Sequence, residues 1–230
     1  MKKFKHPVFE AADFFKKHFK LNTWRKNQLT NLLDILPLFS PGKINCIETG
    51  ASQDINDGCF GAFFAKLSEL TGGEFHSVDL SKSIVNKSKK FFKNLNLKVN
   101  HNVGDSVEFL NNTKVIPNLV HLDSYDINIK NPFPSALHCW REFIAIENKM
   151  PIGSVLIIDD NWFMNTCVEY TYDTPPERKG DIEKVTINYP IIGKGSNVYH
   201  YIEEGNSNWR KLSKDLVGNN VKLIYQKVKL

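Results

Sequence analysis

The sequence is poor in cysteine, and its cysteines show no spacing that would build a disulfide framework or a zinc finger. The 230 residues contain Cys46, Cys59, Cys139 and Cys167, which lie far apart and form no Cys-x-x-Cys pair. Such a pattern is typical of reduced thiols. We therefore expect a cytoplasmic protein whose fold does not depend on disulfide bonds.

Long apolar runs are also missing. No stretch approaches the ~20 residues that a membrane-spanning helix needs, and the basic start of the chain is not followed by the apolar segment of a signal peptide. These absences predict a protein without a membrane partner. With 41% hydrophobic and 12% aromatic residues, the chain can bury a hydrophobic core of its own.

Neither sign of charge is in large excess. Thirty Lys and Arg against 25 Asp and Glu give a formal net charge of +5, and Lys-rich segments such as 87–93 carry much of the excess. No cluster of Arg with interleaved aromatic residues appears. A solvated surface is therefore favoured over a nucleic-acid interface. The oligomeric state stays open, a homodimer included.

Strand-like and helix-like segments alternate along the middle of the chain. Amphipathic helical patterns separate five short apolar runs, at residues 44–48, 75–79, 97–103, 119–123 and 154–159. Strands separated by helices form βαβ units. We therefore expect an α/β fold with a doubly wound, mostly parallel sheet that is covered on both faces.

Further elements are predicted on both sides of this core. Two amphipathic helices are expected within residues 1–40, as an extension packed on a domain that spans 41–230. The polar stretch Asn161–Gly195 has few helix signals and is predicted to be a long functional loop. A helix near 197–203 and a last antiparallel strand at 221–228, where apolar residues alternate with lysines, complete the prediction.

Each predicted strand ends at a carboxylate or at a glycine beside one. Turns alone would favour a mixture of Asn, Gly, Ser and Pro, whereas parallel α/β sheets bind ligands at the carboxyl ends of their strands. The pattern therefore predicts a ligand site. The segments, in chain order, are Glu48-Thr49-Gly50-Ala51-Ser52, Asp79, Gly104-Asp105-Ser106, Asp123 and Asp159-Asp160-Asn161.

Several of these residues suit an adenosyl ligand. Gly50 lets the backbone approach a ligand without a Cβ in the way. Asp79 can accept hydrogen bonds from both hydroxyls of a ribose, and Asp105 with Ser106 can offer polar contacts to an adenine edge. The ordered series from Ile44 to Asn161 resembles the successive motifs of the Rossmann-like (class I) S-adenosylmethionine-dependent methyltransferases.

The resemblance implies a seven-stranded sheet and S-adenosylmethionine as the cofactor. The first loop departs from the family pattern, because polar residues follow Gly50 where the family has several glycines. The implied cofactor contacts are Glu48 and Gly50 with the methionine moiety, Asp79 with the ribose, Asp105 and Ser106 with the adenine, and Asp123 facing the reacting sulfur, with Ala51, Ser52 and Leu80 as further cofactor-binding residues.

A second carboxylate group is expected at the ends of the fourth and fifth strands. If those strands are neighbours, as in the family, Asp123 and the pair Asp159 and Asp160 lie about 5 Å apart, and they must share a proton or a cation. Mg²⁺ accepts such oxygen ligands. The arrangement is similar to metal-dependent O-methyltransferases that act on catechols or sugar hydroxyls, which implies Asp123, Asp159, Asp160 and Asn161 as metal ligands. The alternative is that residues 159–161 merely turn the chain.

The residues that would act on a methyl acceptor are less tightly specified. Asp123 and Asp126 are the catalytic candidates, with Asp126 as the base that takes the acceptor proton and Tyr125 and His138 as alternatives. Lys194, between two glycines, is interpreted as a hinge rather than as a contact for an anionic substrate. The aromatic residues of the predicted loop are candidates for a lid over the acceptor: Trp162, Phe163 and Tyr170.

We therefore predict an S-adenosylmethionine-dependent methyltransferase that O-methylates a small hydroxylated molecule or a sugar, with Mg²⁺ as a candidate cofactor. One alternative is a protein of the same fold that binds the adenosyl cofactor without catalysis. Another is an NAD(P) oxidoreductase, which is disfavoured because the chain lacks the G-x-G-x-x-G run that a pyrophosphate needs.

Overall fold

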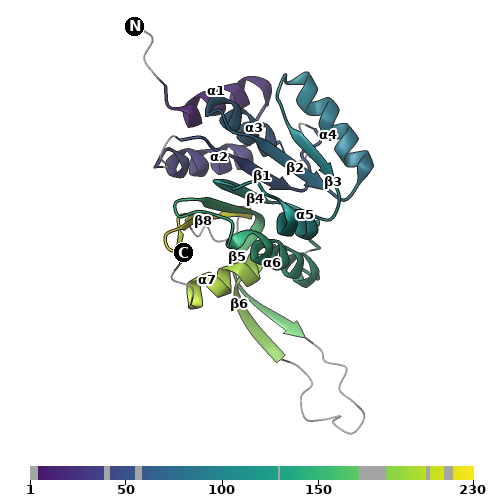
Figure 1. The fold of residues 1–230 in the computed structure, drawn as a ribbon. Coiled ribbons are helices and arrows are strands. Elements are labelled where there is room, and N and C mark those ends of the chain that lie inside the picture. Colours follow the sequence, from purple (N-terminus) through teal and green to yellow (C-terminus); the bar gives the residue numbers. More distant parts are fainter. Residues whose placement is uncertain are drawn as a thin grey trace.

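The computed structural model describes residues 5–38, 42–54, 59–128, 130–170, 185–205, 208–214 and 220–230, without the side chains of 164–170 and 185–190. Within these ranges, eight strands form one mixed sheet with helices on both faces (Figure 1). The prediction of an α/β fold with a mostly parallel sheet is confirmed. Seven strands follow one path across the sheet, as expected, and the eighth pairs off this path.

The parallel half of the sheet has the order β3-β2-β1-β4-β5. Its strands are β1 (Cys46–Thr49), β2 (Phe75–Asp79), β3 (Asn100–Val103), β4 (Leu119–Leu122) and the first part of β5 (Val155–Tyr170). The chain builds outward from β1 to β3 and then crosses back to β4. The winding therefore reverses between β1 and β4, where ligands bind in sheets of this kind.

The antiparallel half corrects the prediction of a long loop at 161–195. β5 is 16 residues long and continues past the predicted strand end, and β6 (Val185–Gly193) pairs with its second part. Figure 1 shows these two strands extending together away from the sheet. The prediction was wrong because polar residues masked a run in which β-branched residues favour a strand. Residues 171–184 of that prediction lie outside the described residues.

The remaining strands follow the helix α7 (Ser196–Glu204) near the end of the chain. β8 (Asn220–Lys227) pairs antiparallel with β5, and the short β7 (Trp209–Lys211) pairs with β8 at the sheet edge. The predicted last strand is therefore the penultimate strand of the sheet. This position gives β8 a neighbouring strand on each side.

One face of the sheet is covered by the helices α1 (Pro7–His18), α2 (Thr23–Ile35), α3 (Phe60–Leu70) and α4 (Lys82–Asn94), with a short 3-10 turn at Leu36–Leu38. The core on this face joins all four helices to alternate strand residues such as Cys46 and Phe75. The ring centroids of Phe15 in α1 and Phe60 in α3 lie 5.1 Å apart. The N-terminal helices thus share the core of the sheet domain.

The other face is covered by α5 (Ser106–Asn112), α6 (Phe133–Glu147) and α7. Residues next in sequence to those of the first face, such as Ile47, point into this second core. The alternation follows from the period of two along a strand. Among the helices in the described part of the chain, none has the length and apolar character that crossing a membrane requires.

Candidate functional site

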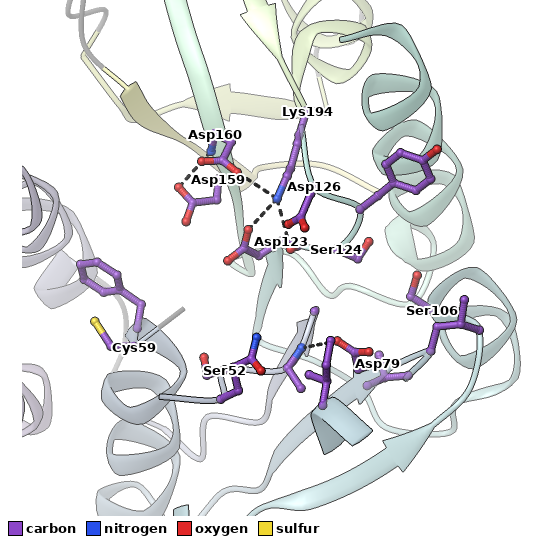
Figure 2. A pocket seen from close by; sticks show the side chains of 18 of the residues that line it. Ser52, Cys59, Asp79, Ser106, Asp123, Ser124, Asp126, Asp159, Asp160 and Lys194 are labelled. Atoms are coloured by element: carbon purple, nitrogen blue, oxygen red, sulfur yellow. Dashed lines mark hydrogen bonds and ion pairs between the residues drawn. The ribbon is translucent and has the colours of Figure 1, made fainter. Parts of the chain in front are cut away.

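A cavity of about 490 Å³ opens at the carboxyl ends of the parallel strands, on both sides of the point where the winding reverses. The loops after β1, β2, β4 and the middle of β5 contribute to it, and side chains of α2, α3 and α6 complete its wall. Figure 2 shows the labelled side chains facing one another across it. Most predicted site residues line it: Gly50, Ala51, Ser52, Asp79, Leu80, Asp105, Ser106, Asp123, Asp126, Asp159 and Asp160.

Asp79 organises one end of the cavity. Its Oδ2 accepts a hydrogen bond from the Ala51 backbone N–H at 3.1 Å, and its Oδ1 accepts one from the Ser81 N–H at 2.7 Å. The carboxylate therefore ties the loop after β1 to the start of α4. Each oxygen keeps lone pairs for a further donor. Leu80, next in the chain, is exposed beside it.

Gly50 brings the loops after β1 and β4 into contact. Its φ of +80° is in the left-handed region, and a Cβ at this position would lie 2.5 Å from the backbone oxygen of Asp123. Only glycine tolerates both the conformation and the approach. The loop after β1 can therefore lie directly against the strand end that carries Asp123.

Asp105 and Ser106 mark the wall formed by α5. The Asp105 carboxylate caps this helix by accepting the Glu108 N–H at 2.9 Å. The Ser106 hydroxyl lies 3.0 Å from Nε2 of His138, which is also 3.5 Å from a carboxylate oxygen of Glu142. The hydrogen bond to Glu142 raises the pKa of His138. A polar chain thus runs behind this wall of the cavity.

Tyr125 lies over this wall. Its backbone is left-handed, with a φ of 57°, and its ring centroid is 5.5 Å from that of His138. Ser124, before it, donates to Glu142 at 2.6 Å. The loop after β4 is therefore fixed on one side by α6, while Asp126, further along the same loop, faces the cavity.

Glu48 lies beneath the cavity and does not line it. It is fully buried and accepts hydrogen bonds from the N–H and the hydroxyl of Ser52, at 3.3 and 3.0 Å. Gly61 leaves it room, since a Cβ there would lie 2.7 Å from its carboxylate. Burial raises the pKa of Glu48, against the hydrogen bond from His121, which lowers it. Glu48 thus holds the loop after β1 in place through its hydrogen bonds with Ser52.

The three aspartates of the second carboxylate group lie close together, and two lysine side chains lie among them. β4 and β5 are parallel neighbours, which brings Asp123 close to Asp159 and Asp160. The Lys194 ammonium lies 2.7 Å from Asp123 Oδ1 and 3.0 Å from Asp160 Oδ2 (Figure 2), and the Lys222 ammonium pairs with Asp159. Both lysines are buried. Lys194 is therefore a member of the site and not a hinge.

The close packing of these charges shifts their pKa values. Burial raises the pKa of Asp123 to about 7, against the Lys194 ammonium, which lowers it. Burial also opposes ionisation of Asp159, yet the Lys222 ammonium holds the pKa of Asp159 well below its usual range. Burial disfavours the charge of Lys194, but the carboxylates of Asp123 and Asp160 raise its pKa. The neighbouring carboxylates therefore favour the charged form of Lys194.

Asp159 and Asp160 lie at a kink within β5. The register between β5 and β8 shifts between Ile158 and Asn161, and Asp160 has a φ of 54°. The Asn161 amide is buried at this kink, where its nitrogen donates to backbone oxygens and its oxygen accepts the Gly195 N–H at 2.7 Å. Asn161 fixes the backbone and does not line the cavity, so we leave it out of the proposed site.

A divalent metal ion fits this group poorly. Ligand atoms of His121, Asp123 and Asp159 lie within 4.8 Å of one another. However, Lys222 Nζ contacts Asp159 Oδ2 and is 3.3 Å from His121 Nε2, and Lys194 holds Asp123 Oδ1. A metal ion would have to displace both ammonium groups, because like charges this close repel.

Sequence reasoning missed the wall that the N-terminal helices provide. Trp24, Arg25 and Gln28 of α2 line the cavity opposite Asp79, next to Cys59 and Phe60. Trp24 donates to the backbone oxygen of Asn220 at 3.1 Å, and Asn220 donates to Asp160 at 2.9 Å. This wall therefore lies at the end of the cavity formed by Asp123, Asp159, Asp160 and their lysine partners, which we call the carboxylate–lysine end. No local sequence signal marks it, since helix α2 reads as an ordinary amphipathic helix.

Two of the three aromatic residues of the predicted lid, Trp162 and Phe163, do not line the cavity. Phe163 is buried against α7, with its ring centroid 5.7 Å from that of Tyr199, and Trp162 is half-buried beside it. The side chain of Tyr170 lies outside the described residues. Phe163 thus anchors β5 against α7.

No protein-family model matches the sequence, and neither does any curated protein. Solved structures match it at low identity. An O-methyltransferase from Bacillus cereus in complex with SAH is 16% identical over 100% of this chain and 93% of its own, with a TM-score of 0.53. A S-adenosylmethionine-dependent methyltransferase from Clostridium acetobutylicum is 14% identical over 99% and 94%, with a TM-score of 0.51. An rRNA methylase from Streptococcus thermophilus is 10% identical over 98% and 99%, with a TM-score of 0.50.

These likenesses settle the architecture. The chain has the Rossmann-like methyltransferase fold. In this fold the cavity described above lies at the switch point of the sheet, where the general rule for open α/β sheets places a ligand. The methyltransferase fold alone does not name a substrate, because one fold hosts many chemistries.

Proposed function

We propose that the protein is an S-adenosylmethionine-dependent methyltransferase. The observation that carries the proposal is the pairing of Asp79 with the Gly50 loop at the switch point of a methyltransferase fold. In this proposal, Asp79 is the hydrogen-bond acceptor for the ribose, and the backbone of the Gly50 loop is the surface for the rest of the cofactor. Cavities of a few hundred Å³ are typical of small-molecule sites, and this one is about 490 Å³.

Each half of the cavity has a role in this proposal. The cofactor, when bound, supplies a methyl group on a positively charged sulfur, and the protein supplies position and charge. Asp79 accepts the ribose hydroxyls, Asp105 and Ser106 contact the adenine, and the loop from Gly50 to Ser52 holds the methionine moiety. Asp123 faces the sulfur, where its carboxylate favours the positive charge.

The acceptor in this proposal is a small molecule with a hydroxyl group. At the carboxylate–lysine end, the cavity wall carries the aromatic side chains of Trp24 and Phe60, which suit a compact organic acceptor. Gln28 lines the same wall. Within the described residues, neither amide atom of buried Gln28 has a hydrogen-bond partner. Asp126 takes the acceptor proton as the methyl group is transferred. An rRNA acceptor is the alternative that the likeness to rRNA methylases leaves open.

Magnesium is not carried into this proposal. The sequence-based expectation was that Asp123, Asp159, Asp160 and Asn161 share a metal ion. In the structure, lysines pair with the three aspartates, and Asn161 is engaged with the backbone. The predicted need for a positive charge between the carboxylates is met by Lys194 and Lys222.

Calorimetric titration with S-adenosylhomocysteine tests the proposal. We expect saturable binding, and no binding of NAD⁺ under the same conditions, because the sequence lacks the G-x-G-x-x-G run that binds a pyrophosphate. Incubation with methyl-labelled cofactor and panels of catechols, sugars and rRNA then separates an enzyme from a protein that only binds. Absence of heat with S-adenosylhomocysteine would remove the proposal. Binding without transfer to any acceptor would favour the non-catalytic alternative.

A further inference from the structure

We infer that the Lys194 ammonium supplies the positive charge at the acceptor end of the cavity, where Asp123, Asp159 and Asp160 lie. It occupies the place that a divalent metal ion would otherwise take. This inference deepens the proposed function, since it concerns how the same cavity holds its acceptor. Lys194 follows β6, whereas Asp123 follows β4 and Asp160 lies within β5. One ammonium therefore joins three segments that are distant in the sequence (Figure 2).

The Lys194 ammonium donates two hydrogen bonds to Asp123 and forms an ion pair with Asp160. An ammonium group has three N–H bonds, and Lys194 Nζ lies 2.7 Å from Asp123 Oδ1, 3.2 Å from the Asp123 backbone oxygen and 3.0 Å from Asp160 Oδ2. The lysine is only 2% exposed, so water does not compete for these contacts. A lysine this deeply buried is stable as a cation only where carboxylates compensate it.

Lys222 engages two further side chains that could bind a metal ion, those of Asp159 and His121. Its ammonium pairs with Asp159 and lies 3.3 Å from His121 Nε2. His121 and Asp159, which could otherwise bind a metal with Asp123, are thus engaged from the side of β8. Two ammonium groups therefore balance two of the three carboxylates, and the third charge is left to compensate the cofactor sulfonium.

The inference also defines the chemistry that the acceptor must offer. Because the Lys194 ammonium is only 2% exposed and lies against the carboxylates of Asp123 and Asp160, this end of the cavity presents mainly carboxylate oxygens to a bound molecule. Such a surface binds groups that donate hydrogen bonds, as a hydroxyl does, and it removes a proton through a carboxylate. The acceptor is therefore held by the hydrogen bonds that it donates.

Binding of Mn²⁺ tests the inference, with the electron paramagnetic resonance signal of the free ion as the readout. We expect no binding to the wild-type protein after chelator treatment. Lys194→Met removes the ammonium and keeps most of the apolar length of the side chain. It frees the carboxylates of Asp123 and Asp160 while Lys222 stays paired with Asp159, so the affinity for Mn²⁺ should rise by about tenfold or more. Lys194→Arg, which keeps the charge, should behave as the wild type does. Adding Asp123→Asn to Lys194→Met should abolish the gain.

The Mn²⁺ titration has two outcomes that would overturn the inference. Wild-type binding of Mn²⁺ that is lost in Asp123→Asn would overturn the inference in favour of a metal site. No gain in folded Lys194→Met would also overturn it, because the lysine would then not occupy the cation position. If melting shows that Lys194→Met does not fold, Lys194→Gln takes its place. Binding of S-adenosylhomocysteine, measured separately with and without chelator, reports on the proposed function, so the two failures are distinguishable.

Discussion

The carboxylates at the ends of β2 and β3 are held by backbone N–H groups, whereas those at the end of β4 and the kink of β5 are held by lysine side chains. Asp79 and Asp105 bind N–H groups within a few residues of a helix start. Asp123 and Asp159 bind Lys194 and Lys222, which lie far along the chain. The first end is built from local structure, while the second exists only once the whole sheet has formed.

This difference predicts that the second end is the more costly to disturb. Lys222→Met leaves the buried Asp159 carboxylate without its partner, so we expect the free energy of unfolding to fall by about 3–5 kcal/mol. Chemical denaturation measures the loss. Lys214→Met, at an exposed lysine, should change it by less than about 0.5 kcal/mol. If Asp159→Asn with Lys222→Met is no more stable than Lys222→Met alone, the unpaired charge is not the cause.

The first end should show its effect in ligand affinity. Asp79→Ala removes the proposed ribose acceptor, and hydrogen bonds to a charged group are worth about 1.5–3 kcal/mol each. We therefore expect the affinity for S-adenosylhomocysteine to fall by about a hundredfold in calorimetry. Asp34→Ala, at an exposed position of α2, is the matched control and should leave the affinity unchanged. Unchanged affinity in Asp79→Ala would count against the ribose assignment.

Cofactor binding should depend on pH through the carboxyl group of Asp123. The raised pKa of Asp123, about 7, means that this carboxyl group gains its negative charge as the pH rises through 7. S-adenosylmethionine carries a positive sulfur and S-adenosylhomocysteine does not, so the affinity ratio should shift by about tenfold toward the former above pH 7. Asp126→Asn should keep the shift and Asp123→Asn should lose it. A flat ratio in the wild type would contradict the proximity of Asp123 to the sulfur.

The smallest effect is expected at Gln28. Its buried amide has no hydrogen-bond partner among the described residues, and an unsatisfied polar group of this kind costs free energy. Gln28→Leu, which keeps the volume, should raise the free energy of unfolding by about 1 kcal/mol, as measured by denaturation. Gln28→Ala is the control that leaves a cavity and should not stabilise. A clear loss of stability in Gln28→Leu would mean that the amide has a partner such as an ordered water.

The contrast between the two ends also explains what the sequence could predict. Strand ends and helix caps are local, so Asp79, Asp105 and Asp123 could be found from alternating apolar runs alone. The adjacency of β4 and β5 came from the family resemblance and is confirmed. The lysine partners were missed because Lys222 alternates with apolar residues like a solvent-facing side chain, and only the position of β8 inside the sheet buries it.

Glu48 and Asn161 show a further limit. Both stand in the expected segments, yet each side chain turns toward backbone groups beneath the cavity. Sequence position specifies the strand end, but the direction of a side chain there depends on the space that neighbours such as Gly61 leave. The hairpin of β5 and β6 was missed for a similar reason, since its pairing is visible only in three dimensions.

The length of β5 makes the projecting hairpin and the acceptor end one continuous piece of backbone. The same strand pairs with β4 in the body, bends at Asp159 and Asp160, and continues outward with β6. Lys194 follows directly on the returning strand. The pairing of Asn161 with Gly193 therefore fixes the return of the chain, and with it the place of Lys194 beside Asp160.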